Sequence, residues 1–306
     1  MNRKELTGSI KNKSLQLGFE AVGMAPAGEM VDEKRRLDKW LEQGMQGTMT
    51  FMVNSAEKRY NPRNIMPEAK SIIVLAHNYF YPIIFKSGSF KISKYAQGKD
   101  YHDILRRKAK LLLEYISEIS PGVRGRICVD SAPIFEKAYA QKAGLGWIGK
   151  HCILILPKAG SYFFLCELLI DIELEYDKPE TDHCGRCRLC LETCPTEAIA
   201  EPYVVNASKC VSYLTIEHKG EMPEDLKNSY NNWIFGCDDC QDVCPFNRFA
   251  KLPSDPDFRP FDEIINMTDD DWKNLTEDKF NRIFEDSPIR RTGYEKFMRN
   301  IRYLSD

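Results

Sequence analysis

Residues 184–195 read CGRCRLCLETCP, and residues 237–245 read CDDCQDVCP. The first stretch has the C-x2-C-x2-C-x3-C-P spacing by which three thiolates hold one [4Fe–4S] cluster while the fourth reaches a second cluster. The second stretch repeats the x2 and x3 spacings but lacks one cysteine, which the solitary Cys210 can supply. We therefore predict two clusters. Their ligands are Cys184, Cys187, Cys190 and Cys244 for the first, and Cys194, Cys210, Cys237 and Cys240 for the second.

A zinc site is the alternative, because two C-x2-C pairs can hold Zn²⁺ tetrahedrally. The third cysteine of the first motif and the Cys-Pro endings of both motifs are not typical of zinc sites, and they favour clusters. The three remaining cysteines lie in apolar stretches, where a thiol usually serves as a small buried hydrophobe. These are Cys128, Cys152 and Cys166.

The composition limits the classes of protein to consider. The 306 residues are 43% hydrophobic and carry a net charge of −2, so a real core is expected and a nucleic-acid binder would need a local basic face. The longest apolar stretch, residues 162–172, contains two acids and is too short to span a membrane. Residues 1–13 lack the apolar core of a secretory signal. We expect a cytoplasmic protein with no membrane association, whose eleven cysteines stay reduced.

Strand and helix patterns intermingle over the first 175 residues, which predicts the α+β class. Helical spacing is expected in residues 1–20, 29–43 and 103–119, and from Pro133 to about Gly144. Strands are expected at residues 71–76, 126–129, 153–156 and 162–174. An acidic, proline-containing linker begins near residue 176. We predict an α+β domain over residues 1–175, a ferredoxin-like domain with two clusters over 176–250, and a helical C-terminal segment over 251–306.

Asp130 ends an apolar strand in the sequence VDSAP and opens onto a loop. A semi-buried carboxyl has a raised pKa and can hold a proton near neutrality, so this position suits acid–base chemistry. An equally good alternative is that Asp130 caps the helix that follows. The glycine-rich stretch 144–149 is not a dinucleotide-binding fingerprint, but its glycines would let the backbone approach a large flat ligand.

Several longer stretches resemble one family. VDSAP, EKAYAQKAGLGWIGKH, CVSYLTIEHKG, CDDCQDVCPFN and SPIRRTG, together with the eight cysteines, resemble the epoxyqueuosine reductases in order and spacing. The match runs from about residue 15 to the end of the sequence. The resemblance implies a first domain similar to nitroreductase-like or cobalamin-processing folds, followed by a ferredoxin-like domain. It also implies a short form without the HEAT-like helical extension of longer members.

The resemblance implies an oxidoreductase that converts epoxyqueuosine to queuosine in the anticodon loop of tRNA, using cob(I/II)alamin fed by the two clusters. Asp130 would be the proton donor. The cobalamin would be base-off with no histidine on cobalt, because the closest D-x-H-x-x-G match, residues 100–105, has leucine in place of glycine. Tyr95 would either face the substrate pocket or pack in the core. Candidate cobalamin contacts are Leu154, Leu165, Ser212 and Asp238.

Two basic runs could meet tRNA, one at residues 106–110 and one near the C-terminus, although such runs are usually solvated helix faces. We predict tRNA contacts at Arg290, Arg291 and Arg299. The other expected partner is an unidentified low-potential electron donor, and a monomer is expected. Two alternatives stay open: a reductive dehalogenase-like corrinoid iron–sulfur enzyme, and a non-catalytic ferredoxin-type electron-transfer or corrin-trafficking protein.

Overall fold

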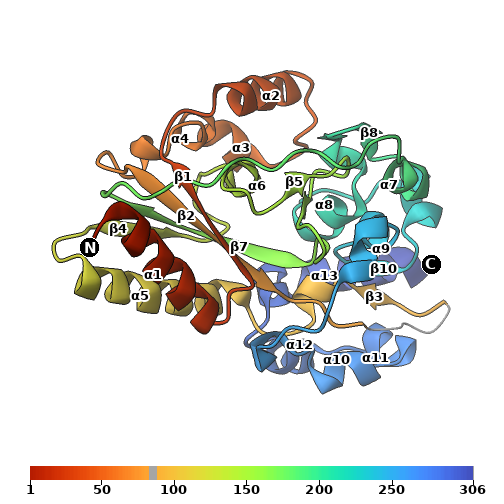
Figure 1. Ribbon diagram of the computed structural model, residues 1–306. Helices are drawn as coiled ribbons and strands as arrows, with labels where there is room; N and C mark the ends of the chain where they lie inside the picture. The colour runs from red at the N-terminus through yellow and green to blue at the C-terminus, as the bar shows by residue number, and fades with distance from the viewer. Residues whose placement is uncertain (83–87, 306) are drawn as a thin grey trace.

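The computed structural model describes residues 1–82 and 88–305 of the chain (Figure 1). Its central feature is a four-stranded antiparallel sheet in the order β1-β2-β7-β4. The two inner strands are long and apolar, and every residue of β2 is buried, so both faces of the sheet require a cover. The strands are β1 (Ala21–Pro26), β2 (Ser71–Asn78), β7 (Phe163–Ile170) and β4 (Gly125–Cys128).

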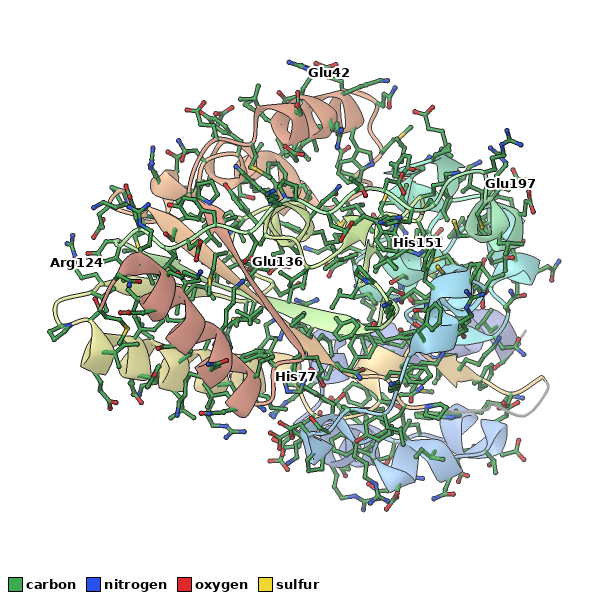
Figure 2. The ribbon with its side chains drawn as sticks, viewed as in Figure 1. Glu42, His77, Arg124, Glu136, His151 and Glu197 are labelled. Carbon is green, nitrogen blue, oxygen red and sulfur yellow. The ribbon has the colours of Figure 1, made fainter. Side chains whose placement is uncertain are left out.

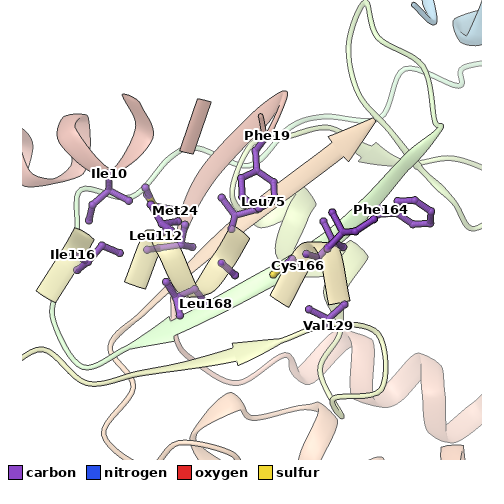
Figure 3. Packing of buried hydrophobic residues seen from close by; sticks show 14 of the residues in the cluster. Ile10, Phe19, Met24, Leu75, Leu112, Ile116, Val129, Phe164, Cys166 and Leu168 are labelled. Atoms are coloured by element: carbon purple, nitrogen blue, oxygen red, sulfur yellow. The ribbon is translucent and has the colours of Figure 1, made fainter. Parts of the chain in front are cut away.

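Helices α1 (Arg3–Gln16) and α5 (Tyr101–Ile119) cover one face of the sheet. Figure 3 shows this core, in which Ile10 of α1 and Leu112 of α5 pack with Leu168 of β7. Asp100 caps α5 by accepting a hydrogen bond from the backbone N–H of His102, 2.9 Å away. Successive β7 side chains point to opposite faces, so the alternate residues, Leu165 to Leu169, face a second core. Helix α6 (Glu136–Lys142) covers that second face.

The cysteine-rich segment consists of short elements connected by loops. It contains α7 (Leu189–Thr193), β8 (Ile199–Glu201), β9 (Val204–Val205), α8 (Val211–Ile216), β10 (Trp233–Phe235) and α9 (Asp239–Asp242). Helices α7 and α9, which carry one cysteine motif each, lie against one another. Strand β10 pairs in parallel with β3 (Lys91–Ile92), so this segment is joined to the chain before α5.

Four helices follow near the C-terminus: α10 (Asp262–Asn266), α11 (Asp269–Lys273), α12 (Glu277–Ile283) and α13 (Tyr294–Ser305). Their apolar side chains share one core with Ile92 of β3 and Phe235 of β10. All three segments predicted from the sequence therefore contribute to this core, and the C-terminal helices are an integral part of the fold.

The remaining elements are helix α2, of twelve residues, and several short ones. They are α2 (Val31–Glu42), α3 (Thr50–Asn54), α4 (Ala56–Arg59), β5 (Trp147–Ile148), β6 (Leu154–Ile155) and seven 3-10 turns among the described residues, which lie at Pro62–Asn64, Lys94–Ala96, Ala207–Lys209, Glu224–Ser229, Pro245–Phe249, Pro256–Phe258 and Pro288–Thr292. None of the described helices is both long enough and apolar enough to cross a membrane.

The helices and strands expected in the first domain are confirmed, with ends that differ by a few residues. Strand β1 was missed, because Gly23 and the terminal Pro26 weaken its strand pattern. Gly23 is needed there, since a Cβ atom would lie 2.1 Å from the carbonyl oxygen of Ala143. Cys128 and Cys166 are buried as expected, whereas Cys152 is only half-buried and has a positive φ of 63°.

A polar network ties the segment after the cysteine motifs to the sheet. Lys108 of α5 is buried and donates to the carboxylate of Asp255 and to the carbonyl oxygen of Leu17, the latter at 2.8 Å. The fully buried imidazole of His77 on β2 lies 3.5 Å from the same carboxylate. Within the basic run at residues 106–110, Lys108 is therefore a structural residue, whereas Arg106, Arg107 and Lys110 are exposed.

We expect Asp255→Ala to lower the free energy of unfolding by about 3 kcal/mol or more, because it leaves the buried Lys108 ammonium without its ion-pair partner. Anaerobic urea unfolding of the holoprotein measures the change. The matched control is Asp257→Ala, which breaks an ion pair to the largely exposed Arg107 (2.9 Å) and should cost about 1 kcal/mol or less. Equal losses in the two variants would contradict the structural role of Asp255.

Candidate active site

The fold brings the eight predicted ligand cysteines into two groups. Burial and the neighbouring thiols of Cys184, Cys244 and Cys187 raise the pKa of Cys190 to about 11. In the second group, burial and the neighbouring Cys210 and Cys194 raise the pKa of Cys240 well above its usual range, and Cys237 lies beside Cys240 and Cys210. When four thiols lie close together, the negative charge of each thiolate disfavours ionisation of the others. The positively charged iron core of a cluster would stabilise the thiolates, so each group fits a four-cysteine cluster.

A single zinc ion would need its thiolates about 2.3 Å from one point. Among the described residues, no three His, Cys, Asp or Glu side chains lie close enough to one point to bind a single metal ion. The cysteine groups therefore give no support to the zinc alternative.

The glycine-rich stretch packs around the first cysteine group. The indole Nε1–H of Trp147 donates to Cys184 Sγ at 3.5 Å, and the Lys150 ammonium donates to the carbonyl oxygens of Gly185 and Cys187 at 2.6 and 2.8 Å. A donor to a cluster sulfur, such as Trp147, tunes the reduction potential, and Lys150 fixes the backbone of the loop that carries the cysteines. The sequence did not identify Trp147 or Lys150, because neither residue type signals a cluster by itself.

One glycine of this stretch is required by the packing of the chain itself, and the expectation that the glycines admit a flat ligand stays a prediction. A Cβ atom on Gly146 would lie 2.0 Å from the carbonyl oxygen of Ile155, so the close pairing of β5 with β6 already requires glycine there. The same stretch ends at His151, which is 4% exposed and has no hydrogen-bond partner for Nε2. Burial lowers the pKa of His151 to about 4, so its ring is neutral.

Two of the four candidate cobalamin residues lie in the core of the first domain, and two lie beside cysteines of the second cluster group. Leu154 and Leu165 belong to the hydrophobic core that α6 covers. Ser212 lies on α8, half-buried, two residues after Cys210. Asp238 is 1% exposed, and its carboxylate already accepts hydrogen bonds from the Ser93 hydroxyl and from the backbone N–H of Lys94.

Asp130 lies in the loop after β4 and faces the first turn of α5. Its Oδ2 atom is 3.2 Å from Nε2 of His102 and 4.0 Å from Nη1 of Arg291. The other ring nitrogen of His102, Nδ1, is 2.7 Å from Oδ1 of Asp100. The ring of Tyr101 stacks on the imidazole, with 4.2 Å between centroids. One imidazole is thus held between two carboxylates.

This arrangement decides which group holds the proton. Burial alone would lower the pKa of His102, but the hydrogen bonds and charges of Asp100 and Asp130 raise it to about 9. Burial raises the pKa of Asp130, yet the hydrogen bond and charge of His102 and the charge of Arg291 outweigh it and leave the pKa below its usual value. At neutral pH the pair is an imidazolium and a carboxylate.

Two expectations for Asp130 are therefore corrected. Its pKa is not raised, because the sequence did not reveal the two cations that approach it from elsewhere in the chain. Asp130 also does not cap α6, whose N-cap is Phe135 with no side-chain cap bond. Instead it has a positive φ of 49°, and its own N–H donates to Oε1 of Glu136 at 2.7 Å.

Tyr95 lies in a cluster of aromatic side chains. Tyr95 packs against Phe235, Tyr101 and Phe164, as the packing alternative predicted.

Of the three predicted tRNA residues, Arg299 donates to three backbone carbonyl oxygens, of Leu214, His218 and Gly220, so its guanidinium is used inside the protein. Arg290 and Arg291 are exposed and line a surface pocket of about 380 Å³ beside His102, together with Lys99, Asp100, Asp103, Ile104, Glu285, Asp286 and Ser287.

His102 is the residue that sequence reasoning missed. It was considered only as a cobalt ligand, and both of its ring nitrogens are occupied by Asp100 and Asp130. The available signal was the Asp-x-His spacing at a helix start, where an N-cap aspartate can also reach a side chain in the first turn.

Family models match two segments of the chain. The family model "Epoxyqueuosine reductase QueG, DUF1730" matches residues 59–131, and a model of a 4Fe-4S double cluster binding domain matches residues 183–247. The chain therefore contains a 4Fe–4S binding domain within a mixed helix-and-sheet fold.

Proteins named epoxyqueuosine reductase are similar over nearly the whole chain. That of Cellulophaga algicola is 47% identical over 305 residues, which cover 99% of this chain and 100% of the relative. That of Escherichia coli K12 is 39% identical and covers 98% of this chain and 81% of the relative.

Solved structures agree with these matches. A crystal structure of epoxyqueuosine reductase with a tRNA-Tyr epoxyqueuosine-modified stem loop has a TM-score of 0.91 at 29% identity, covering 99% of this chain and 81% of that one. A Bacillus subtilis epoxyqueuosine reductase whose catalytic aspartate loop is swung out of the active site also has a TM-score of 0.91 at 29% identity. It covers 99% of this chain and 82% of that one.

We expect anaerobically reconstituted protein to hold about eight iron and about eight sulfide per chain, as two four-iron cubanes require. Cys210→Ser should reduce both to about four, because it removes a ligand of one cluster only. Cys152→Ser is the matched control, a half-buried cysteine outside both groups, and should leave the iron content unchanged. Full iron content in Cys210→Ser would show that another residue completes the second cluster.

Proposed function

The chain belongs to the epoxyqueuosine reductase family, and from this membership we propose that it reduces epoxyqueuosine to queuosine in the anticodon loop of tRNA. The observation that carries the proposal is the His102–Asp130 pair, an acid unit whose partners Asp100 and Arg291 line a surface pocket. The reaction removes the epoxide oxygen as water, consuming two electrons and two protons. The protein must therefore supply protons to an oxygen and electrons to the adjoining carbons.

The proposed cofactors are two [4Fe–4S] clusters, held by the two cysteine groups, and one base-off cobalamin. When bound, cobalamin would accumulate the two electrons that clusters deliver singly. Leu154, Leu165, Ser212 and Asp238 remain our candidates for holding it. The unpartnered, neutral Nε2 of His151 fits a polar ligand in this region. The occupied nitrogens of His102 argue against that residue as a cobalt ligand.

In this proposal Asp130 Oδ2 donates a proton to the substrate oxygen, and His102 then reprotonates Asp130. His102 Nε2 carries the proton at neutral pH and lies within hydrogen-bonding reach of Oδ2. Arg291 and the stacked Tyr101 would hold the pair in place. The Bacillus subtilis relative, whose catalytic aspartate loop can leave the active site, supports placing the acid on a loop.

We propose that tRNA docks over the pocket beside this pair, with Arg290 and Arg291 near its phosphates. The relative bound to a modified tRNA stem loop supports tRNA as the partner class. Arg299 is left out of this surface because its donors are used internally.

The other expectations remain proposals: a nitroreductase-like first domain, a cytoplasmic monomer and a separate low-potential electron donor. The dehalogenase alternative is not favoured, because relatives named epoxyqueuosine reductase match nearly the whole chain. An electron-transfer or corrin-trafficking protein without catalysis would not need the proton donor that the His102–Asp130 pair provides.

We expect Asp130→Asn to slow single-turnover conversion of an epoxyqueuosine-bearing stem loop by about 10²–10⁴-fold while iron content is retained. Wild-type turnover should fall as pH rises through about 9, because His102 loses its proton there. The control is Asp171→Asn, a carboxylate paired with Arg124 (3.1 Å) at the opposite end of β4. Undiminished turnover in Asp130→Asn would remove Asp130 from the acid role, and an inactive wild type would refute the proposed function.

We expect the double variant Arg290→Ala, Arg291→Ala to bind the stem loop more weakly and with a smaller salt dependence, since each lost phosphate contact lowers the salt slope by about 0.7–0.9. Filter binding at several salt concentrations measures this slope. The control is Arg35→Ala and Arg36→Ala, two exposed arginines on α2. An unchanged slope in the first variant would place the tRNA surface elsewhere.

A further inference from the structure

The two cysteine groups differ in how exposed their surroundings are. In the second group, Cys237 lies between two buried residues, Gly236 and Asp238. In the first motif, the residue before each of the first three cysteines is exposed, and these residues are His183, Arg186 and Leu189. A cluster held by the first group would therefore lie nearer to solvent. Because electron transfer slows steeply with distance, this is the cluster that a protein donor from outside can reduce.

The loop between Cys184 and Cys187 is open on its outer side and fixed on its inner side. Gly185 has a positive φ of 48°, and a Cβ atom there would meet no described atom within 4 Å. On the inner side, the buried Lys150 ammonium donates to the carbonyl oxygens of Gly185 and Cys187 at 2.6 and 2.8 Å. A surface that is formed in advance loses little conformational entropy when a partner binds.

Arg186 and Arg188 give this loop a positive charge. Both side chains are exposed, and neither forms an ion pair or a side-chain hydrogen bond with a described residue. The Lys150 ammonium adds a cation beneath them. Glu192 follows Arg188 by four residues on α7, but in the described part of the chain its carboxylate forms no ion pair with either arginine. The positive charge is a local excess, because the whole chain has a net charge of −2.

The acids that precede the loop do not neutralise the two arginines. The carboxylate of Asp182 accepts the backbone N–H of Cys184 at 2.7 Å and the phenol hydroxyl of Tyr203. The carboxylate of Glu180 lies 3.1 Å from Nε2 of His183. Both carboxylates therefore have other partners, and the arginines remain available to an external anion.

We propose that Gly185, Arg186, Arg188 and Leu189 form an entry surface, on which an acidic one-electron carrier protein docks to reduce the cluster of the first cysteine group. The inference rests on the proposed function, which consumes two electrons per substrate. At each encounter the carrier is oxidised by one electron and the cluster is reduced by one, so two encounters supply one turnover. Leu189 is 41% exposed and adds an apolar contact. Electron-transfer partners bind through small surfaces, and opposite charges speed their association.

The position of the entry surface favours a protein donor over RNA. Helix α7, which begins at Leu189, lies at one edge of the molecule, away from α5, whose first turn carries His102 (Figure 1). Glu197, four residues after α7, is labelled at the same edge in Figure 2. A carrier on the entry surface and a stem loop beside His102 would therefore occupy different parts of the molecule. The arginines also lie on either side of Cys187, a predicted cluster ligand.

The test measures reduction of the clusters directly, in the absence of tRNA. Stopped-flow absorbance follows the bleaching of the clusters after the holoprotein is mixed with a reduced flavodoxin, an acidic one-electron carrier. At low ionic strength the double variant Arg186→Ala, Arg188→Ala should be reduced about tenfold more slowly than wild type, because the lost charges lower the association rate. The difference should disappear at about 1 M salt, where the Debye length is about 3 Å.

Three controls isolate the charge of the entry surface. Reduced methyl viologen, a small cation, should reduce the double variant as fast as wild type, which shows that the clusters are intact. Arg186→Lys, Arg188→Lys keeps both charges and should restore the rate with flavodoxin. The matched control is Arg35→Ala, Arg36→Ala, which removes the same net charge from α2 and should leave the rate with flavodoxin unchanged.

Rates with flavodoxin that stay within twofold of wild type in the Arg186, Arg188 double variant, or an equal loss in the α2 control, would overturn the entry surface. A wild type that methyl viologen reduces and flavodoxin does not would overturn it as well. Weaker binding of the stem loop with unchanged cluster reduction would overturn it by assigning the two arginines to tRNA. A wild type that flavodoxin reduces but that converts no epoxyqueuosine would refute the proposed function and leave the entry surface in place.

Discussion

Strand β7 is buried on both faces between β2 and β4, and the rest of the structure follows from covering it. An eight-residue strand with apolar side chains on both faces needs helices above and below, and α5 and α6 provide them. The first turn of α5 and the loop before α6 meet at one edge of the sheet. The imidazole of His102 and the carboxylate of Asp130 are brought together there by packing that has no chemical role of its own.

Asp130 lies at the boundary between two opposite electrostatic environments. Toward solvent it meets the imidazolium of His102 and the guanidinium of Arg291, which favour its carboxylate. Toward the core it meets Glu136 and, behind it, Glu167, where burial favours neutral carboxyl groups. Proton affinity therefore rises from Asp130 into the protein, while the two cations keep the carboxyl group of Asp130 ionised at neutral pH.

The sequence predicted the parts of this protein that depend on local spacing. The cysteine motifs, the long helix α5 and the buried strand β2 each have a pattern contained in a few consecutive residues. Prediction from the sequence failed where the pKa or the exposure of a side chain depends on partners far away in the chain. The pKa of Asp130 is set by His102, 28 residues away, and by Arg291, so strand-end position alone gave the wrong direction. Arg299 looked like a surface cation until the fold placed three carbonyl oxygens around it.

The contact between His77, Lys108 and Asp255 has a consequence for the synthesis of the protein. Ribosomes release the chain from its N-terminus, so all four strands of the sheet are available well before residue 255 is made. Until then Lys108 lacks the carboxylate with which it forms an ion pair in the folded protein, and the sheet cannot reach its final stability. The cysteine motifs, made in the interval, emerge while the sheet is still incomplete.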